Sequence, residues 1–388
     1  MNIKRDPMKP KKVLLVAGEV SGDLLGSHLV EAIQEIDPEI QFFGVGGEGL
    51  RKRGMKILYP SQSLAVVGLT EVFLKLGLIL RALRALNHFL EEERPDLVIL
   101  IDFPDFNLRL AKIAHRKGIP ILYYVSPQVW AWRQGRVRLI SRCVKKMVVL
   151  FPFEVPFYER EGVEVEWVGH PLIDIVTPTL SKEEAYLRFG LDPQRRTVAL
   201  LPGSRKKEVE RLLPTLLETS RLLYDEIPDL QFIIPLAQGI SSQELHLTES
   251  LSYPLKVVEG WTYDIMNLSE LLITASGTAT LEGAILGKPM VIVYKLSRLS
   301  YWVGRMLIQV DHIGLVNLVS EKRIVPELIQ DEANPKRIAE EAFRILKDPI
   351  SRQKMVESIR EVRMRLGESG ASKRAARIVY SMLREGEG

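Results

Sequence analysis

The run Leu97–Ile101 is a continuous stretch of aliphatic, mostly β-branched residues that ends at the carboxylate of Asp102. An uninterrupted apolar run of this length is typical of a strand buried on both faces of a parallel sheet. Ligands bind outside the carboxyl ends of the strands in open α/β sheets, so Asp102 stands where a catalytic group is expected. Asp102 and Asp105 could instead cap the helix whose pattern begins near Leu108, and spacing alone leaves both alternatives open.

Similar apolar runs alternate with helical periodicity along both halves of the chain. Strands separated by helices imply βαβ units and parallel, doubly wound sheets. The pattern thins around residues 169–180, which indicates a linker. We therefore expect an α/β protein with two Rossmann-like domains, residues 1–175 and 176–350, that face a cleft. A helical tail, residues 351–388, is expected to pack back on the first domain or on a partner. The expected strands are residues 13–17, 41–45, 97–101, 121–125, 146–150, 165–168, 197–201, 231–235, 256–258, 270–274 and 290–293.

Composition narrows the class of protein. A chain of 388 residues is longer than one hydrophobic core usually extends. The single cysteine, Cys143, cannot form an internal disulfide, which indicates a reducing compartment. No segment has the roughly 18 uncharged apolar residues of a membrane span, and the run after the basic N-terminus is too short for a signal peptide. We therefore expect a cytoplasmic protein. The sequence also lacks zinc-ligand spacing and a P-loop, so no metal site is expected.

Leu201-Pro202-Gly203-Ser204-Arg205 lies between an expected strand and an expected helix. Gly203 allows a tight turn, and the helix N-terminus offers N–H groups and the positive end of its dipole. Arg205 adds a fixed charge suited to bidentate phosphate binding. A strand–glycine–helix turn alone is common, but with Ser204 and Arg205 it favours a phosphate site.

The segment from Ser276 to Glu282 follows another expected strand. Ser276, Gly277 and Thr278 can hold a diphosphate, and Glu282 can accept hydrogen bonds from both hydroxyls of a ribose. The alternative is a small-residue helix start with an exposed carboxylate. Two anion-friendly turns and a carboxylate in one domain favour a nucleotide over an isolated phosphate. Asn317 could bind a polar ligand nearby or satisfy backbone groups in a loop.

Residues 66–86 are apolar nearly all round, because only four of them are charged. Basic residues at 51–53 and 56 precede this segment. An apolar surface rimmed by positive charge fits docking to a membrane interface, whereas a buried crossover helix or a dimer interface fits the pattern equally well. The expected lipid-facing residues are Val66, Val67, Leu69, Val72, Phe73 and Leu76.

Two tryptophans, Trp130 and Trp132, stand beside Arg133 in a loop that follows an expected strand. One of the two tryptophans could pack in the hydrophobic core. Two of them around a single alanine indicate a platform in the cleft.

Several of these segments together resemble the lipid-A-disaccharide synthase family. They occur in order from about residue 13 to about residue 330, and the tail beyond Pro335 is similar only in general character. The motifs SGD, at residues 21–23, and SPxVWAWR, at 126–133, are the most specific. The segments are residues 16–23, 101–107, 124–133, 201–205, 276–282 and 315–318.

The resemblance implies an inverting, metal-independent glycosyltransferase of the two-Rossmann GT-B type that needs no cofactor. Its substrates would be UDP-2,3-diacylglucosamine and 2,3-diacylglucosamine 1-phosphate (lipid X). It would join them through a β-1,6 bond and release UDP in lipopolysaccharide biosynthesis. The resemblance also implies peripheral association with the cytoplasmic face of the inner membrane and no nucleic-acid partner. It leaves open whether the chain works as a monomer or a homodimer.

By the same resemblance Asp102 is the general base, with Asp105 as a secondary candidate, while Arg205, Glu282 and Asn317 correspond to residues linked to the UDP-sugar. Phe103 and Gln128 stand where the family often has smaller residues, which would alter the acceptor pocket. The remaining expected UDP-sugar residues are Gly203, Ser204, Ser276, Gly277 and Thr278. The expected acceptor-side residues are Glu19, Ser21, Gly22, Asp23, Ser126, Trp130, Trp132 and Arg133.

Three alternatives remain at the level of sequence. Two are enzymes with the same two-domain architecture, a UDP-GlcNAc 2-epimerase and the transferase that makes lipid II. The third is a nucleotide-sensing or membrane-scaffolding protein without turnover. The apolar segment 66–86 disfavours the epimerase, which acts on a soluble sugar. Asp102 beside a nucleotide site disfavours the protein without turnover.

Overall fold

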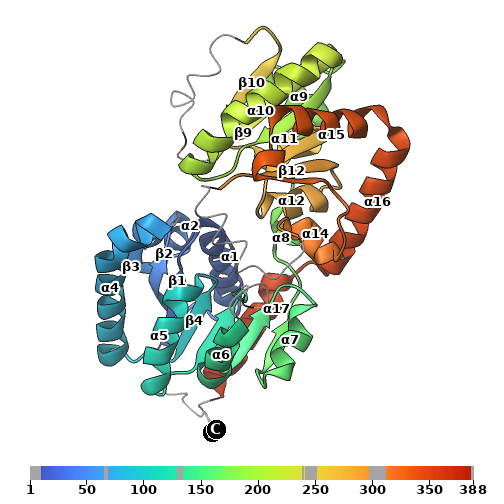
Figure 1. Cartoon of the computed structure of the whole chain (residues 1–388). Coiled ribbons are helices and arrows are strands. Elements are labelled where there is room, and N and C mark those ends of the chain that lie inside the picture. Colours follow the sequence, from blue (N-terminus) through green and yellow to red (C-terminus); the bar gives the residue numbers. More distant parts are fainter. Residues whose placement is uncertain are drawn as a thin grey trace. The chain divides into compact units, whose positions relative to one another are not determined.

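The computed structural model describes residues 10–64, 69–127, 129, 134–237, 240, 251–296 and 312–385 (Figure 1), and for residues 69–76 and Gln134 it describes the backbone alone. The described residues form two compact units. Unit 1 contains the described residues from 10 to 171 and from 368 to 385, and unit 2 contains those from 172 to 296 and from 312 to 367. Among the described residues, no helix is both long and apolar enough to cross a bilayer.

Unit 1 is built on seven parallel strands in the order β3-β2-β1-β4-β5-β6-β7. The order reverses between β1 and β4, which pair with Ala17 opposite Ile101. This reversal is the topological switch point at which open α/β sheets bind ligands. The strands are β1 (Lys12–Ala17), β2 (Gln41–Gly46), β3 (Lys56–Pro60), β4 (Leu97–Ile101), β5 (Ile121–Tyr124), β6 (Lys146–Val149) and β7 (Val165–Trp167).

Helices cover the unit 1 sheet because its strands are apolar toward both faces. Among the described residues, helices α3 to α7 all contribute to one hydrophobic cluster with the strands. Helix α1 approaches the sheet closely through Gly26, where a Cβ would lie 2.9 Å from Cδ1 of Ile101. Helix α17, from the C-terminal end of the chain, packs against α1 through an alanine-rich face. The helices are α1 (Val20–Ile36), α2 (Glu48–Lys52), α3 (Ser61–Leu64), α4 (Leu69–Glu92), α5 (Pro104–Arg116), η1 (Gln134–Arg136), α6 (Val137–Cys143), α7 (Glu154–Arg160) and α17 (Ala371–Arg384).

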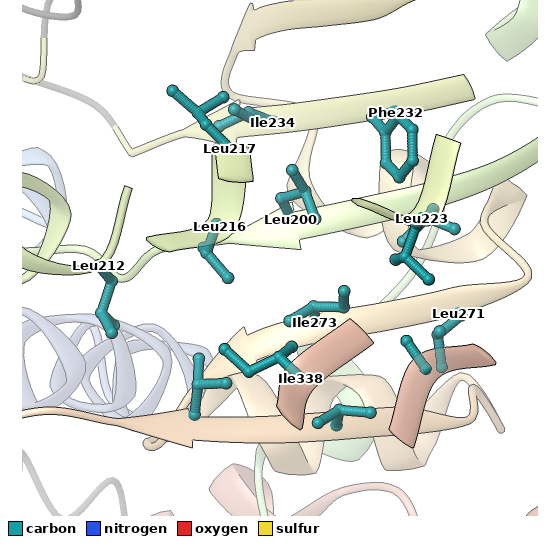
Figure 2. Packing of buried hydrophobic residues seen from close by; sticks show 14 of the residues in the cluster. Leu200, Leu212, Leu216, Leu217, Leu223, Phe232, Ile234, Leu271, Ile273 and Ile338 are labelled. Atoms are coloured by element: carbon teal, nitrogen blue, oxygen red, sulfur yellow. The ribbon is translucent and has the colours of Figure 1, made fainter. Parts of the chain in front are cut away.

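Unit 2 has six parallel strands in the order β10-β9-β8-β11-β12-β13. Its core forms where the strands meet α10 (Lys206–Glu226) and α15 (Pro335–Lys347). Figure 2 shows leucine and isoleucine side chains and Phe232 of this core. The strands are β8 (Arg196–Leu201), β9 (Leu230–Leu236), β10 (Leu255–Glu259), β11 (Leu271–Ala275), β12 (Met290–Tyr294) and β13 (Glu327–Ile329).

The residues of the expected C-terminal tail divide between the two units. Helix α16 stays with unit 2, where Arg352 donates to the carboxylate of Glu270. The guanidinium of Arg196 also donates two hydrogen bonds to the carboxylate of Glu270, at 2.8 and 3.0 Å. Helix α17 belongs to unit 1. The remaining helices of unit 2 are α8 (Leu172–Ile175), α9 (Lys182–Phe189), α10 (Lys206–Glu226), α11 (Thr262–Leu268), α12 (Ala279–Ile285), α14 (Leu315–Ser320), η4 (Gln330–Glu332), α15 (Pro335–Lys347) and α16 (Pro349–Arg365).

Candidate functional site

The carboxyl end of β4 carries two consecutive residues in the left-handed region, Asp102 with φ 43° and Phe103 with φ 47°. This conformation costs a non-glycine residue about 1–3 kcal/mol and persists only where the surroundings impose it. The N–H of Asp102 still donates to the carbonyl of Val125 at 3.2 Å, so the pairing with β5 extends one residue beyond the strand. The left-handed turn therefore begins at Asp102, whose side chain is half-buried.

Asp102 is not the N-cap of α5, because Phe103 occupies that position and makes no side-chain cap bond. Asp105 is exposed in the first turn of α5, where a carboxylate interacts favourably with the helix dipole. It also forms an ion pair with Arg136 of η1. The two carboxylates thus occupy different environments: Asp102 lies in the turn, and Asp105 joins the start of α5 to η1.

Phe103 lies directly against the end of β1. A side chain at Gly18 would place its Cβ 2.3 Å from Cδ1 of the Phe103 ring, so residue 18 must lack one. The ring also stacks on Phe106, with centroids 5.4 Å apart. Beyond Gly18, Glu19 is the half-buried N-cap residue of α1. The large residue at 103 therefore fills the space between the ends of β1 and β4.

Asp23, expected on the acceptor side, has a structural role in the fold. Its carboxylate accepts hydrogen bonds from the backbone N–H groups of Gly47 at 2.6 Å, Gly49 at 2.8 Å and Leu50 at 3.3 Å. These groups lie at the start of α2, so Asp23 caps a helix other than its own. A Cβ at Gly47 or Gly49 would lie 2.8 Å from Oδ2 of Asp23, which explains both glycines.

Some of the other expected acceptor-side residues lie in the described part of the chain, and the rest lie outside it. Ser126 is buried, and its hydroxyl pairs with that of Tyr158 at 2.6 Å. Gly22 packs against Ala17 and Ile101, and Ser21 is half-buried in the first turn of α1. Gln128, Trp130, Trp132, Arg133, Val66 and Val67 lie outside the described residues, and the side chains of Leu69, Val72, Phe73 and Leu76 are not described.

In unit 2, β8 and β11 are neighbours with Leu201 opposite Thr274, so the two expected phosphate turns follow adjacent strand ends. Gly203 has φ 116°, and a Cβ there would lie 2.7 Å from Oε2 of Glu208. Arg205 is the exposed N-cap residue of α10 and donates to Oε1 of Glu208 at 3.3 Å. Ser204 is also exposed.

The second turn is held by backbone contacts. The N–H of Ser276 donates to the carbonyl of Val293 at 3.1 Å, and its hydroxyl donates to the carbonyl of Ile313 at 3.3 Å. Gly277 has φ 155°, and its carbonyl accepts a hydrogen bond from the hydroxyl of Thr280 at 2.8 Å. Thr278 is the exposed N-cap residue of α12.

Glu282 lies in the first turn of α12 and is half-buried. Burial raises the pKa of its carboxyl group to about 7. Burial also raises the pKa of Tyr263 on α11, and the charge of Glu282 raises it further. Glu282 therefore titrates near neutrality, where a hydrogen-bonding ligand could shift its protonation.

Asn317, expected to contact a UDP-sugar, is fully buried and bonded within the chain. Its amide donates to Oε1 of Glu327 at 2.7 Å and to the carbonyl of Val325 at 2.9 Å. Its carbonyl oxygen accepts from the N–H groups of Ile324 and Val325. These four bonds satisfy the amide, so we assign Asn317 a structural role.

The role of Asn317 extends to the Ser276 turn. Glu327 is buried, and its carboxylate accepts from the N–H groups of Ile313 at 3.1 Å and Gly314 at 3.0 Å. The carbonyl of Ile313 in turn accepts the hydroxyl of Ser276. Asn317 and Glu327 therefore fix the loop on which Ser276 rests.

Sequence reasoning did not identify three buried polar residues that hydrogen-bond the backbone beside the candidate site. They are Tyr123, Asn107 and Glu327. The available signal was a polar residue in an apolar pattern. Asn107 stands on the same helical stripe as Ala111 and Ala114, and Glu327 begins a short apolar strand. A buried polar residue at such a place needs partners, which sequence does not name.

Comparison with known proteins identifies the family. The family model described as lipid-A-disaccharide synthetase matches residues 13–380. The chain belongs to the lipid-A-disaccharide synthetase family. A relative named lipid-A-disaccharide synthase from Geobacter metallireducens is 50% identical over 96% of this chain and 97% of its own length. Another from Syntrophus aciditrophicus is 47% identical over 98% and 100%, respectively. The resemblance inferred from sequence is thereby confirmed.

Solved structures confirm the two-Rossmann GT-B fold of this family member. UDP-GlcNAc 2-epimerase from Neisseria meningitidis, bound to UDP-GlcNAc, matches with a TM-score of 0.67 and 15% identity over 95% of this chain and 100% of that chain. The calicheamicin glycosyltransferase CalG4 matches with a TM-score of 0.62 and 16% identity over 97% and 99%, respectively. At these identities the likeness concerns the fold alone.

Proposed function

We propose that the chain transfers 2,3-diacylglucosamine from UDP-2,3-diacylglucosamine to the 6-hydroxyl of lipid X. The products are the β-1,6-linked lipid A disaccharide 1-phosphate and UDP, within lipopolysaccharide biosynthesis. The observation that carries this proposal is the 50% identity to a lipid-A-disaccharide synthase over 96% of the chain. The glycosyltransferase activity follows from the family, and the substrates and mechanism are our proposal.

Asp102 is the general base of the proposed reaction. It takes the proton of the acceptor 6-hydroxyl as that oxygen attacks the anomeric carbon, while the bond to the UDP oxygen breaks. A single displacement of this kind inverts the configuration. General-base catalysis contributes about 10²–10⁴ in rate. The strained turn at the sheet's switch point supports this role, because such strain clusters at active sites.

Unit 2 binds the nucleotide in this proposal. Arg205 and Ser204 contact the diphosphate from one turn, Ser276 and Thr278 contact it from the other, and Glu282 accepts the ribose hydroxyls. The fixed charge of Arg205 stabilises the departing UDP, so the reaction needs no metal ion. Asn317 acts indirectly, by holding the loop beneath Ser276.

A UDP-release assay tests the function. The protein is incubated with UDP-2,3-diacylglucosamine and lipid X, once with Mg²⁺ and once with EDTA. We expect equal UDP release in both, and a disaccharide product by mass spectrometry. Release that requires Mg²⁺ contradicts metal independence. UDP binding without release favours a nucleotide-sensing protein, and conversion of UDP-GlcNAc to its 2-epimer favours an epimerase.

Glu282 makes UDP binding depend on pH. Ribose hydroxyls donate to the ionised carboxylate, so UDP stabilises the charged form of a group whose pKa is about 7. Affinity for UDP should therefore rise with pH between about 5.5 and about 7 and then level off. The measurement is calorimetric titration across this range. In Glu282→Gln only the phosphate of UDP titrates. If the UDP affinities of wild type and this variant depended on pH in the same way, Glu282 would not belong to the site.

We also propose that unit 1 associates peripherally with an anionic membrane. Helices α5 and α6 pack together and present five exposed cations. Arg109, Lys112 and Arg116 are three and four residues apart on α5, so they lie on one face of that helix. Among the described residues, none of the five forms an ion pair. The cations are Arg109, Lys112, Arg116, Arg138 and Arg142.

Vesicle co-sedimentation tests this surface. We expect binding to vesicles with phosphatidylglycerol, weakened by salt, and little binding to pure phosphatidylcholine. Each cation near an anionic surface contributes about 1 kcal/mol, so R109Q/K112Q/R116Q should weaken binding at least about tenfold at low salt. The control K354Q/R360Q/R363Q removes equal charge from α16 in unit 2. Equal loss in both variants would mean that net charge, rather than this surface, governs binding.

A further inference from the structure

The carbonyl group of Asp102 is held by two buried side chains. It accepts the hydroxyl of Tyr123 at 2.6 Å and the amide of Asn107 at 2.7 Å. The same amide donates to the carbonyl of Ile101 at 3.1 Å. Tyr123 comes from β5 and Asn107 from α5, so the strands and the covering helix both contribute to the turn.

Burying the Tyr123 hydroxyl and the Asn107 amide away from water is unfavourable unless they are hydrogen-bonded. Tyr123 and Asn107 are fully buried in an otherwise apolar layer. Burial raises the pKa of Tyr123, and the charge of Asp102 raises it further, so the hydroxyl stays protonated and donates. Replacing either residue would remove one of the two donors to the carbonyl of Asp102, and losing a hydrogen-bond partner away from water is unfavourable.

These contacts provide the constraint that a left-handed turn requires. Asp102 and Phe103 are both L-residues at positive φ, which an isolated strand end would not adopt. In this turn the carbonyl of Asp102 faces Tyr123 and Asn107. Without these donors the turn would relax toward extended or helical backbone, and the carboxylate would move.

We propose that Tyr123 and Asn107 are positioning residues for Asp102. Resting on the proposed function, this inference states that they hold the backbone turn that orients the base toward the acceptor hydroxyl. They act on kcat and leave substrate binding unchanged, because neither touches the substrates. A displacement of about 1 Å at a reacting group can cost about 10²-fold in rate.

Tyr123→Phe removes only the hydroxyl donor. We expect kcat to fall about tenfold to about a hundredfold, with KM for both substrates and the affinity for UDP within about twofold of wild type. Tyr253→Phe is the matched control, because Tyr253 is a buried tyrosine whose hydroxyl donates to the carbonyl of Leu217 at 2.9 Å, within unit 2. Its loss should lower the melting temperature similarly and leave kcat unchanged.

Two further variants complete the test. Asn107→Ala introduces a strong helix former into α5, so the helix is preserved, and it should reproduce the selective loss of kcat. In an Asp102→Asn background, Tyr123→Phe should cause no further loss, because its effect passes through Asp102. A Y123F kcat within twofold of Y253F, or additive losses in the double variant, would overturn the inference. Failure of the proposed function is a separate outcome, since wild type itself would then release no UDP.

Discussion

Asp102→Asn lowers turnover by about 10²–10⁴-fold while the affinity for UDP stays within about twofold of wild type. The substitution removes the proton acceptor and keeps the shape of the side chain. Asparagine also suits this position because, unlike alanine, it tolerates the left-handed region that residue 102 occupies with φ 43°. The loss therefore reports on the base and not on backbone strain. Single-turnover UDP release measures the rate, and calorimetry measures UDP binding.

Asp105→Asn is the control for this prediction. Asp105 is exposed and paired with Arg136, and exposed ion pairs contribute at most about 1 kcal/mol. We expect turnover within about threefold of wild type and a small drop in stability. If D105N were inactive and D102N retained the wild-type rate, the role of base would belong to Asp105.

Asn317→Ala lowers the free energy of unfolding by about 3 kcal/mol and weakens UDP binding about tenfold or more. Four hydrogen bonds of a fully buried amide are lost, and the side chain of Glu327 loses one donor. The loop beneath Ser276 then loses part of its support. Urea unfolding of the full chain measures the stability, and calorimetric titration measures the UDP affinity.

Asn334→Ala is the matched control in the same unit. The side chain of Asn334 caps α15 by accepting the N–H of Arg337 at 3.0 Å. Loss of such a cap costs about 1 kcal/mol and should leave UDP affinity unchanged. An N317A protein as stable as N334A, with wild-type UDP binding, would show that the Asn317 network does not support the site.

The central strands were predictable because a strand that is buried on both faces has a continuous apolar run in its sequence. Strands β1, β4, β8 and β11 lie within a residue or two of their expected bounds. The short strands β3 and β13 were missed. Both lie at sheet edges, and β3 is only partly buried, so neither carries the apolar signal of a central strand.

The position of a candidate site residue was predictable where that residue follows a strand. Asp102 and Ser276 come directly after an apolar run, and Arg205 follows the end of one by four residues. Parallel strands gather such residues at one edge of their sheet. The hydrogen-bond partners of residues that bind distant parts of the chain were not predictable. Asp23 binds N–H groups 24 to 27 residues further along the chain, and the amide of Asn317 bonds residues seven to ten positions away.

The sequence alone determined the α/β class, the two doubly wound sheets, the family and the placement of Asp102 at a strand end. These properties depend on local order: apolar periodicity, turn residues and short contiguous motifs. The tertiary structure alone decided which polar side chains are bonded within the fold. It buried Asn107 and Tyr123 against the carbonyl of Asp102 and held that residue in a left-handed turn. Hydrogen-bond partners come from separate strands and helices, and only their packing brings them within 3 Å.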